Sequence, residues 1–498
     1  MVNPIKIGRS LKETYLRYLD TGIPLAGDFY IKERRKLYAQ DGVIMQSPII
    51  ELTRKYKGEE SISEICCKNG IDSDIADFLN LGLLKDKIER KLYRHQKKAF
   101  LDVFKNQKNM IVTTGTGSGK TECFMIPVIA NLIDESKEWS LPKERNHAVR
   151  TLIMYPLNAL AEDQMVRLRK SLEQDSVKNW LDKNRKGNRF TFGRYTGRTP
   201  GKLGETRERS LRKAIADWEN LKNQKEQTPQ IYDDDLQFSI PCTDENSAEQ
   251  IIRQDMQKNP PDILITNYSM LNIMLMRNRE LDIFEKTKEW LKDPNHIFTL
   301  VIDELHTYKG TAGTEVSYII KVLLNRLGLT PDSPQVRFLA SSASLTKNER
   351  IDIFLRDFFG TNNAEKFSLI EDEPIKQIER KELPVFPQLI FTELASLQEL
   401  DDTQIDTILQ ILQKYGFNSI YEFMEQYKLL DLLKYALQDE NGKLTAKTIS
   451  DISACLFQNE GNALKFTEVL LTLLNLCTDN KKEYIQRSEE HTSELQSL

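Results

Sequence analysis

A glycine-rich segment between an apolar run and a helical pattern carries the clearest chemistry in the sequence. The segment TGTGSGKT follows the β-branched run Asn109–Thr114 and precedes the apolar stretch ECFMIPVIANLI. Its glycines let backbone N–H groups curl around phosphate oxygens, and the N-terminus of the following helix adds a partial positive charge. This order of strand, loop, Lys-Thr pair and helix is typical of a P-loop and predicts a nucleoside triphosphate site.

Each residue type in the loop suits a part of that ligand. Lys120 is predicted to reach the β- and γ-phosphates of ATP, and the Thr121 hydroxyl is predicted to ligate Mg²⁺. Thr114 departs from the general pattern, which has glycine at this position. The predicted phosphate-binding residues are Thr114, Gly115, Thr116, Gly117, Ser118, Gly119, Lys120 and Thr121.

A pair of carboxylates follows a second apolar run, in the segment VIDELH from Val301 to His306. Asp303 is predicted to hold Mg²⁺ through water, and Glu304 to orient and deprotonate the attacking water. His306 is predicted to lie near the γ-phosphate and to link the nucleotide state to neighbouring loops, although a surface histidine is the alternative. With Lys120 these residues form the predicted catalytic set.

Short apolar runs that alternate with longer helical patterns must position these groups. Near-continuous β-branched runs of this kind predict a parallel sheet covered by helices on both faces, an α/β fold. The predicted strands are Asn109–Thr114, Thr151–Tyr155, Asp262–Thr266, Phe298–Asp303 and Val336–Ser341.

The patterns divide the chain into segments. Apolar residues at helical spacing, such as Ile405, Ile408, Leu409 and Leu412, predict a mostly helical C-terminal part in which strands stop after about Lys347. The predicted segments are an accessory region at 1–90, the ATP-binding domain at 91–346 with a polar insertion at about 201–260, and the helical segment at 347–486.

The tail needs separate treatment, because residues 487–497 read RSEEHTSELQS. This string resembles the in-frame translation of a sequencing-adapter oligonucleotide. Residues 487–498 are therefore expected to be an artefact, and the native sequence is expected to stop near Gln486 as a fragment of a longer protein.

Charge and cysteine usage limit the function classes. The chain has 70 Lys+Arg and 74 Asp+Glu among its 498 residues, a formal net charge of −4, which excludes a globally basic coat for nucleic acid. Its six cysteines form no CxxC pair and predict neither a disulfide framework nor a zinc site. No signal peptide and no run near ~18 apolar residues is evident, so a cytoplasmic protein without a membrane span is expected.

One stretch nevertheless carries strong positive charge. Between Lys183 and Lys213 there are eleven Lys/Arg and two Glu, a local net charge of 11 − 2 = +9, interleaved with Phe190, Phe192 and Tyr195. Cations for phosphates and aromatic faces for bases are what a groove for single-stranded nucleic acid uses. The alternatives are a solvated helical face for the cations and core packing for the aromatics.

The motifs, in order from Tyr93 to Ser344, resemble those of superfamily 2 helicases of the DEAD/DEAH type. The resemblance implies that the ATP-binding domain is the first of two RecA-like domains. LYRHQ resembles the Q motif, in which the Gln96 amide would both donate to and accept from adenine. SSAS resembles the SAT motif and implies a coupling role for Ser342, Ala343 and Ser344, the last replacing threonine.

Narrower motifs are similar to those of bacterial YprA-like helicases and of large helicases in phage-defence systems. These are YPLNALAEDQ, YTGRTPG, PDILITNYSML and DELHTYKGTAGTEV, together with the N-terminal NPIKIGRSLKETYLRYLDTGIPL. The resemblance implies ATP-driven translocation on single- or double-stranded DNA, with 3′→5′ polarity, and contacts to one strand's backbone. The residues so implied are Thr196, Gly197, Arg198, Thr266 and Asn267.

Two alternatives stay open. The partner could be RNA, because backbone contacts do not fix the sugar, or the chain could be a nucleotide-gated scaffold in a defence or repair complex. Hydrolysis in such helicases also needs arginines of a second RecA-like domain, worth roughly 10³–10⁵ in rate in related NTPases. Only Arg350, Arg356 and Arg380 lie between Ser344 and the tail, so slow hydrolysis is expected of this chain.

Overall fold

The computed structural model divides the chain into two compact units. Arg54–Asp372 form what we call the sheet unit, and Met1–Thr53 with Glu373–Leu498 form the helical unit. The structure describes residues 4–40, 42–46, 48–52, 56–86, 89–115, 117–156, 158–201, 204–226, 238, 241, 246–342, 349–371, 377–397, 404–439, 442, 444–457, 461–476, 478–479 and 482–483.

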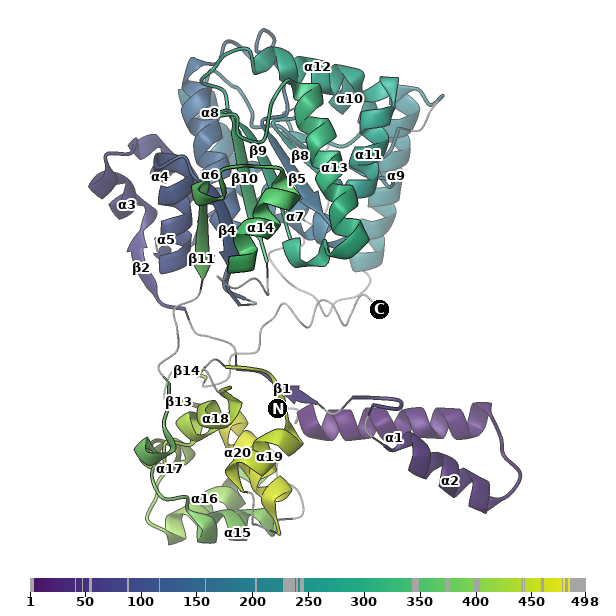
Figure 1. Cartoon of the computed structure of the whole chain (residues 1–498), viewed down its shortest axis with the longest axis vertical. Coiled ribbons are helices and arrows are strands. Elements are labelled where there is room, and N and C mark those ends of the chain that lie inside the picture. The colour runs from purple at the N-terminus through teal and green to yellow at the C-terminus, as the bar shows by residue number, and fades with distance from the viewer. Residues whose placement is uncertain are drawn as a thin grey trace. The chain divides into compact units, whose positions relative to one another are not determined.

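An eight-stranded sheet forms the centre of the sheet unit (Figure 1). Its order is β11-β4-β10-β9-β5-β8-β6-β7, and every neighbouring pair is parallel. The central strands are buried on both faces, which explains their continuous apolar runs. The strands are β4 (Asn109–Thr113), β5 (Thr151–Tyr155), β6 (Phe192–Tyr195), β7 (Glu249–Gln250), β8 (Ile263–Asn267), β9 (Phe298–Ile302), β10 (Val336–Ser341) and β11 (Phe367–Glu371).

Helices cover both faces of this sheet, and alternate strand residues enter different cores. Met110 and Val112 join the core beneath α4 and α6, whereas Ile111 between them joins the core beneath α12 and α13 (Figure 1). The first face carries α3 (Ile62–Asn69), α4 (Ser73–Leu81), α5 (Arg94–Phe100), α6 (Lys120–Glu135), α7 (Asn158–Leu172) and α8 (Asp175–Asn184). The second carries α11 (Tyr268–Met276), α12 (Leu281–Trp290), α13 (Gly310–Leu327) and α14 (Glu349–Phe359).

The predicted α/β fold with a parallel sheet is confirmed, and the strands at 151–155 and 336–341 have the predicted bounds. The expectation that strands stop after about Lys347 is wrong, because β11 pairs with β4 from Phe367↔Asn109 onward. A half-exposed edge strand such as FSLIE has too short an apolar pattern to stand out. The polar insertion likewise contributes β7 to the sheet, besides α9 (Arg207–Glu226) and α10 (Arg253–Lys258).

The predicted boundary at residue 90 is also wrong. Strand β2 (Gly58–Ser61) pairs antiparallel with β3 (Lys91–Tyr93), and α4 buries Phe78 against Trp180 and Phe190. Residues from Arg54 onward therefore belong to the sheet unit. The predicted boundary at 346 differs as well, since that unit extends to Asp372.

The helical unit joins the two ends of the chain through a small antiparallel pair. Strand β1 (Ile49–Ile50) pairs with β12 (Lys447–Thr448), and a core of Leu, Phe and Ile side chains from the C-terminal helices packs around it. The mostly helical C-terminal segment is confirmed as α15 (Gln388–Ala395), α16 (Ile405–Lys414), α17 (Ile420–Gln426), α18 (Leu429–Leu437), α19 (Ile449–Leu456) and α20 (Ala463–Leu476), followed by β13 (Thr478–Asp479) and β14 (Lys482–Glu483).

The N-terminal part of the helical unit is a hairpin of α1 (Pro4–Gly22) and α2 (Asp28–Tyr38). Asp20 closes the hairpin by ion pairs with Arg34 at 2.7 Å and Arg35 at 2.6 Å. The suspected adapter residues 487–498 lie outside the described part of the chain. Among the helices that are described, none has the length and apolar character needed to cross a membrane.

Candidate functional site

The P-loop connects β4 to α6 at the carboxyl edge of the sheet. Gly117 and Gly119 adopt left-handed backbone angles, with φ of 72° and 73°, which glycine tolerates without steric cost. The N-cap of α6 is Gly119, which has no side chain that could accept a hydrogen bond from the first N–H groups of the helix. An anion placed here meets both these N–H groups and the helix dipole.

The side chain of Thr114, at a position where the general pattern has glycine, has a structural role in the loop. Its side chain is fully buried, and its hydroxyl lies 2.6 Å from the Ser118 hydroxyl, which closes the base of the loop. The Lys120 Nζ donates to the Thr114 carbonyl at 3.3 Å. The structure therefore places these predicted phosphate-binding residues in one loop, with Thr121 in the first turn of α6; Thr116 lies outside the described residues.

The Gln96 side chain is fully buried and supports the P-loop. Its Oε1 accepts the Tyr93 N–H at 3.1 Å, and its Nε2 donates to the Gly119 carbonyl at 3.2 Å. The second N–H and the second lone pair of the amide take no part in these two bonds. The contact of this amide with adenine stays a prediction.

Three rings beside the loop form a cluster that the sequence did not reveal. Tyr56 lies 5.4 Å from Tyr93 and 5.0 Å from His95 between ring centroids, and a His95 ring nitrogen lies 2.7 Å from the Ser118 carbonyl. The antiparallel pair of β2 and β3 brings Tyr56 here from a distant part of the chain. Tyr56 and Tyr93 are only half-buried.

The acidic pair begins where β9 ends. The Asp303 carboxylate accepts hydrogen bonds from the Ser341 hydroxyl and, at 3.0 Å, from the Glu304 N–H. Burial raises the pKa of the Asp303 carboxyl above its ordinary value, while the bond from Ser341 opposes that rise. A buried carboxylate that is hard to ionise alone is suited to a cation partner, and the nearby Lys120 contributes one.

Glu304 has a strained backbone, with a φ of 50° in the left-handed region that non-glycine residues rarely adopt. Its Oε2 lies 3.2 Å from Nδ1 of His306. Such strain costs of order 1–3 kcal/mol and is often found at functional sites. His306 is thus in direct contact with Glu304, and its predicted place near the γ-phosphate stays a prediction.

Ser341, the first residue of SSAS, contacts the acidic pair. It was not among the predicted coupling residues, but its hydroxyl donates to Asp303 and accepts the Glu304 N–H at 3.2 Å. Ser342 is buried and donates its N–H to the Val112 carbonyl at 2.8 Å. The predicted coupling residues Ala343 and Ser344 lie outside the described residues.

The residues implied in nucleic-acid contact lie together at the same edge of the sheet. β6 and β8 are parallel neighbours that pair Tyr195 with Thr266, whose hydroxyl donates to the Tyr195 carbonyl at 2.8 Å. Asn267 caps α11 by accepting the Met270 N–H at 2.8 Å. Of this set Thr196 and Thr266 are buried, whereas Gly197 and Arg198 are exposed.

The basic stretch differs from the predicted groove. Phe190, Phe192 and Tyr195 are fully buried in the two cores, so they cannot stack on bases, and the alternative of core packing is confirmed for them. Much of the positive charge is also paired with acids elsewhere in the unit. The pairs are Arg185–Asp74, Arg189–Asp182, Arg194–Glu162 and Arg207–Asp255.

A smaller set of cations remains available on this surface. Arg198 is exposed and makes no ion pair with another described residue, and the same holds for Lys183, Arg209 and Lys213. Local charge counted from the sequence therefore overstates the basic surface. Arg198 stands out because it lies in the loop after β6, the strand that pairs with β8, at whose end Thr266 and Asn267 lie.

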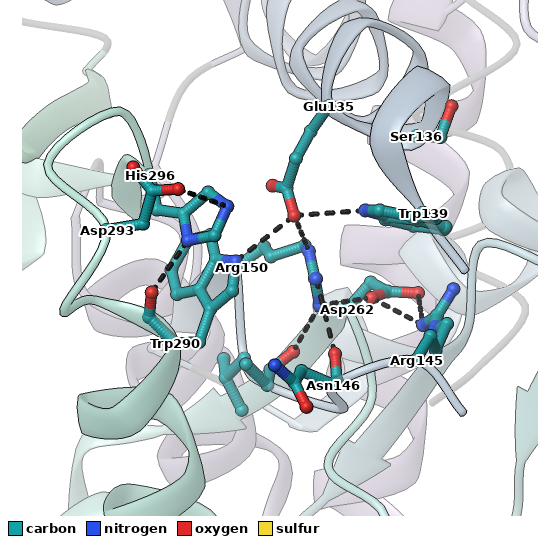
Figure 2. A network of polar contacts seen from close by, with 12 residues as sticks. Glu135, Ser136, Trp139, Arg145, Asn146, Arg150, Asp262, Trp290, Asp293 and His296 are labelled. Atoms are coloured by element: carbon teal, nitrogen blue, oxygen red, sulfur yellow. Dashed lines mark hydrogen bonds and ion pairs between the residues drawn. The ribbon is translucent and has the colours of Figure 1, made fainter. Parts of the chain in front are cut away.

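A buried ion network lies at the opposite, amino edge of the sheet (Figure 2). Asp262 precedes β8, is fully buried, and accepts from Arg145 at 2.6 Å and from Arg150 at 2.8 Å. Arg150 also donates to Glu135 at 2.8 Å, so it lies between two carboxylates in Figure 2. Burial opposes ionisation of Asp262, but the two arginines outweigh it and lower its pKa.

This fold and site define a class of protein. A parallel sheet with a P-loop after β4 and an Asp-Glu pair after β9, on strands next to β10, is the arrangement of a RecA-like P-loop NTPase. Residues 93–212 match the family model of the DEAD/DEAH box helicases. Residues 93–212 therefore belong to a DEAD/DEAH box helicase domain.

Several proteins of known sequence are similar to the chain. The chain is 32% identical over 407 residues to the Druantia protein DruE of Escherichia coli (strain UMEA 4076-1), covering 73% of this chain and 22% of DruE. It is 23% identical over 260 residues to the uncharacterized ATP-dependent helicase YprA of Bacillus subtilis (strain 168), covering 52% and 24% respectively. The chain therefore spans about a quarter or less of the length of these two relatives.

Among solved structures, the crystal structure of the DUF1998 helicase MrfA bound to DNA is similar, with 19% sequence identity and a TM-score of 0.38. The alignment covers 82% of this chain and 48% of MrfA. The strand order and the site geometry, and not this low score, carry the assignment of the fold.

Proposed function

We propose that the chain is the first motor domain of a superfamily 2 helicase or translocase, which couples ATP–Mg²⁺ hydrolysis to movement on DNA. One observation carries the proposal. The P-loop, the Asp303–Glu304 pair and the exposed Gly197–Arg198 tip all lie at the carboxyl edge of one parallel sheet. In open α/β sheets this edge is where ligands bind.

The ATP site supports assigned roles for this chain's residues. Lys120 neutralises the phosphates and the P-loop N–H groups hold them, while Thr121 and Asp303 hold Mg²⁺. Burial raises the pKa of the Asp303 carboxyl, and a nearby cation would stabilise its ionised form. Bound Mg²⁺ would neutralise charge that develops on the phosphates. Glu304, oriented by His306 at 3.2 Å, positions the attacking water and accepts its proton.

We infer slow hydrolysis by this chain alone. Rapid hydrolysis in such motors uses arginines that approach the γ-phosphate from a second domain, worth roughly 10³–10⁵ in related NTPases. The arginines after Ser344 are few, and Arg380 lies in the helical unit, with its guanidinium over the ring of Tyr435 at 5.9 Å. Tight ATP binding with little turnover is the expected behaviour.

The proposed track is DNA, with 3′→5′ movement, from the likeness of the motifs to YprA-like helicases. A loop that exposes the Gly197 backbone and the Arg198 guanidinium can contact a nucleic-acid backbone without reading bases, which suits a motor that passes any sequence. Comparing binding to a DNA and an RNA oligonucleotide of the same sequence tests the choice of sugar. Tighter binding to RNA would favour an RNA-remodelling helicase.

The decisive experiment compares the purified chain with its Lys120→Ala and Glu304→Gln variants. Lys120→Ala should lose binding of a fluorescent ATP analogue, whereas Glu304→Gln should retain it and lose residual hydrolysis. ATP binding that survives Lys120→Ala would contradict the site. Robust DNA-stimulated turnover by the wild type, lost in Lys120→Ala, would instead refute the inference of slow hydrolysis.

A nucleotide-gated scaffold in a defence or repair complex is the second candidate. The observation in its favour is the α1–α2 hairpin, where Tyr15, Tyr18, Phe29 and Tyr30 are 48%, 69%, 69% and 62% exposed. Several exposed aromatic side chains on one hairpin are typical of a protein-contact surface. Partner binding by Glu304→Gln that is the same with and without ATP would favour a scaffold over a motor.

A further inference from the structure

The loop at residues 196–201, here the tip loop, is closed by its own hydrogen bonds. The Thr196 N–H donates to the Thr199 hydroxyl at 2.9 Å, and that hydroxyl donates to the Arg194 carbonyl at 2.6 Å. The Thr199 N–H in turn donates to the Thr196 carbonyl at 3.1 Å. This turn leaves Gly197 and Arg198 exposed at the apex.

Two arginines from elsewhere in the chain hold both ends of the tip loop. Arg253, the first residue of α10, donates from Nη2 to the Thr196 carbonyl at 2.8 Å and from its backbone N–H to the Pro200 carbonyl at 3.0 Å. Arg279 donates from Nη2 to the Gly201 carbonyl at 2.9 Å. These N–H groups of Arg253 and Arg279 bind carbonyls of the tip loop and are therefore used within the protein.

Tyr195 ties the two arginines together below the loop. Its hydroxyl donates to Glu280 at 2.6 Å and accepts from Gln257 at 2.7 Å, and Gln257 accepts from Arg279 at 3.3 Å. The Arg253 guanidinium lies over the Tyr195 ring, 5.3 Å from its centroid. Arginine, tyrosine and carboxylate thus form one connected network.

Burial makes this network costly to disturb. Tyr195 and Glu280 are fully buried and Arg253 is 8% exposed. One oxygen of Glu280 and the Nε of Arg253 lack a hydrogen-bond partner among the described residues. Packing alone would be served by apolar side chains at lower desolvation cost. The network is better explained by the need to hold a loop that must already have its final shape, since preorganisation lowers the entropy lost on binding.

We propose that Tyr195, Gln257, Glu280, Arg253 and Arg279 are positioning residues that hold the tip loop in its binding shape, so that they set the affinity for a nucleic-acid backbone without touching it. The inference rests on the proposed function, in which Gly197 and Arg198 contact the strand. In this proposal Tyr195 does not stack on bases. Its side chain lies in the core and supports the tip loop from there.

Tyr195→Phe is the sharpest variant, since it keeps the ring in the core and removes only the hydroxyl. Affinity for a fluorescent single-stranded DNA oligonucleotide should fall about 3- to 10-fold, as expected when the network that holds the loop loses one hydrogen bond of ordinary strength. The slope of log affinity against log salt should not change, because no phosphate contact is removed. Arg198→Ala should instead reduce that slope by about 0.7, the value for one phosphate on a single strand.

A second readout needs no nucleic acid. Trypsin cleavage after Arg198 should be faster in Tyr195→Phe than in wild type, because the loop opens more often. Glu280→Gln, which keeps an acceptor for the Tyr195 hydroxyl, should restore near-wild-type cleavage and affinity relative to Glu280→Leu. Tyr318→Phe, at a tyrosine that is 65% exposed on α13, is the matched control and should change nothing.

The outcomes separate the two ideas. Wild-type affinity in Tyr195→Phe, or an unchanged rate of cleavage after Arg198, would overturn the positioning role and leave the proposed function standing. No oligonucleotide binding by the wild-type chain would overturn the proposed function. If Tyr195→Phe lowers the affinity for an ATP analogue by the same factor as the affinity for DNA, the variant has a general structural effect, and the inference is overturned. A melting temperature so low that the variant is partly unfolded under the conditions of the binding assay would have the same meaning.

Discussion

The hydroxyl of Ser341 donates a hydrogen bond to the carboxylate of Asp303, and its oxygen accepts the Glu304 N–H at 3.2 Å. Ser341 is the last residue of β10, and Asp303 directly follows β9, the parallel neighbour with which β10 pairs from Val336↔Phe298 onward. One hydroxyl therefore fixes both the side chain of the proposed metal ligand and the backbone of the proposed base. Any shift of β10 is transmitted directly to the acidic pair.

Ser341→Ala should weaken Mg²⁺-dependent nucleotide binding. Without the hydroxyl, the Asp303 carboxylate loses a charge-assisted hydrogen bond worth about 1.5–3 kcal/mol, and it is no longer fixed toward the P-loop. The Mg²⁺ concentration for half-maximal binding of an ATP analogue should rise about 10-fold. Ser341→Thr keeps the hydroxyl and is the control, while equal Mg²⁺ dependence in all three proteins would contradict the assigned contact.

Gln96→Ala should lower the affinity for ATP and GTP by the same factor, about 10-fold. The reason is that Gln96 bonds to the Gly119 carbonyl and the Tyr93 N–H, and so supports the loop that binds the phosphates common to both nucleotides. Titration with fluorescent analogues of both nucleotides measures the ratio. If discrimination between ATP and GTP disappears in the variant, Gln96 reads the base after all.

Asp262→Asn should strongly destabilise the sheet unit. The substitution leaves the Arg145 and Arg150 guanidinium groups buried beside a neutral amide, and breaking a buried pair in this way costs about 3–5 kcal/mol. Urea unfolding followed by tryptophan fluorescence suits the measurement, because Trp139 and Trp290 lie in this network.

Asp182→Asn is the matched control for that measurement. Asp182 pairs with Arg189 at 2.7 Å, but its side chain is 52% exposed, so its loss should cost less than about 1 kcal/mol. Similar destabilisation by the two variants would show that burial does not govern the strength of these pairs.

His147 should make the protein less stable in mild acid. Burial, with added repulsion from Arg145 and Arg150, lowers the pKa of His147 from 6.5 to about 4. Below pH 6.5 the unfolded chain takes up a proton that the folded chain does not, so stability falls as the pH drops toward about 4. Above pH 6.5 the histidine is neutral in both states and contributes nothing to the pH dependence.

His147→Gln tests this pH dependence directly. Melting temperatures of wild type and variant should differ by a constant amount above pH 6.5, and the variant should lose less stability between pH 6.5 and 4.5. The same pH dependence of melting temperature for the two proteins throughout that range would contradict a half-buried, neutral histidine.

The sequence by itself determined the features that depend on neighbouring residues. The P-loop follows from a glycine pattern within one strand–loop–helix unit, and the strands at 151–155 and 336–341 follow from local apolar runs. The acidic pair was likewise predicted from a motif at the end of such a run. These features are local because a strand and the turn after it are set by contiguous residues.

Only the tertiary structure decided the features that depend on distant segments. The edge strand β11 became visible through its pairing with β4, and Tyr56 was placed beside the P-loop by the β2–β3 pair. Charge counted along the chain could not show that Arg185 and Arg207 find acids elsewhere, nor that Tyr195 lies inside the core. Packing and ion pairing join residues far apart in sequence, and no local pattern records which partner each side chain meets.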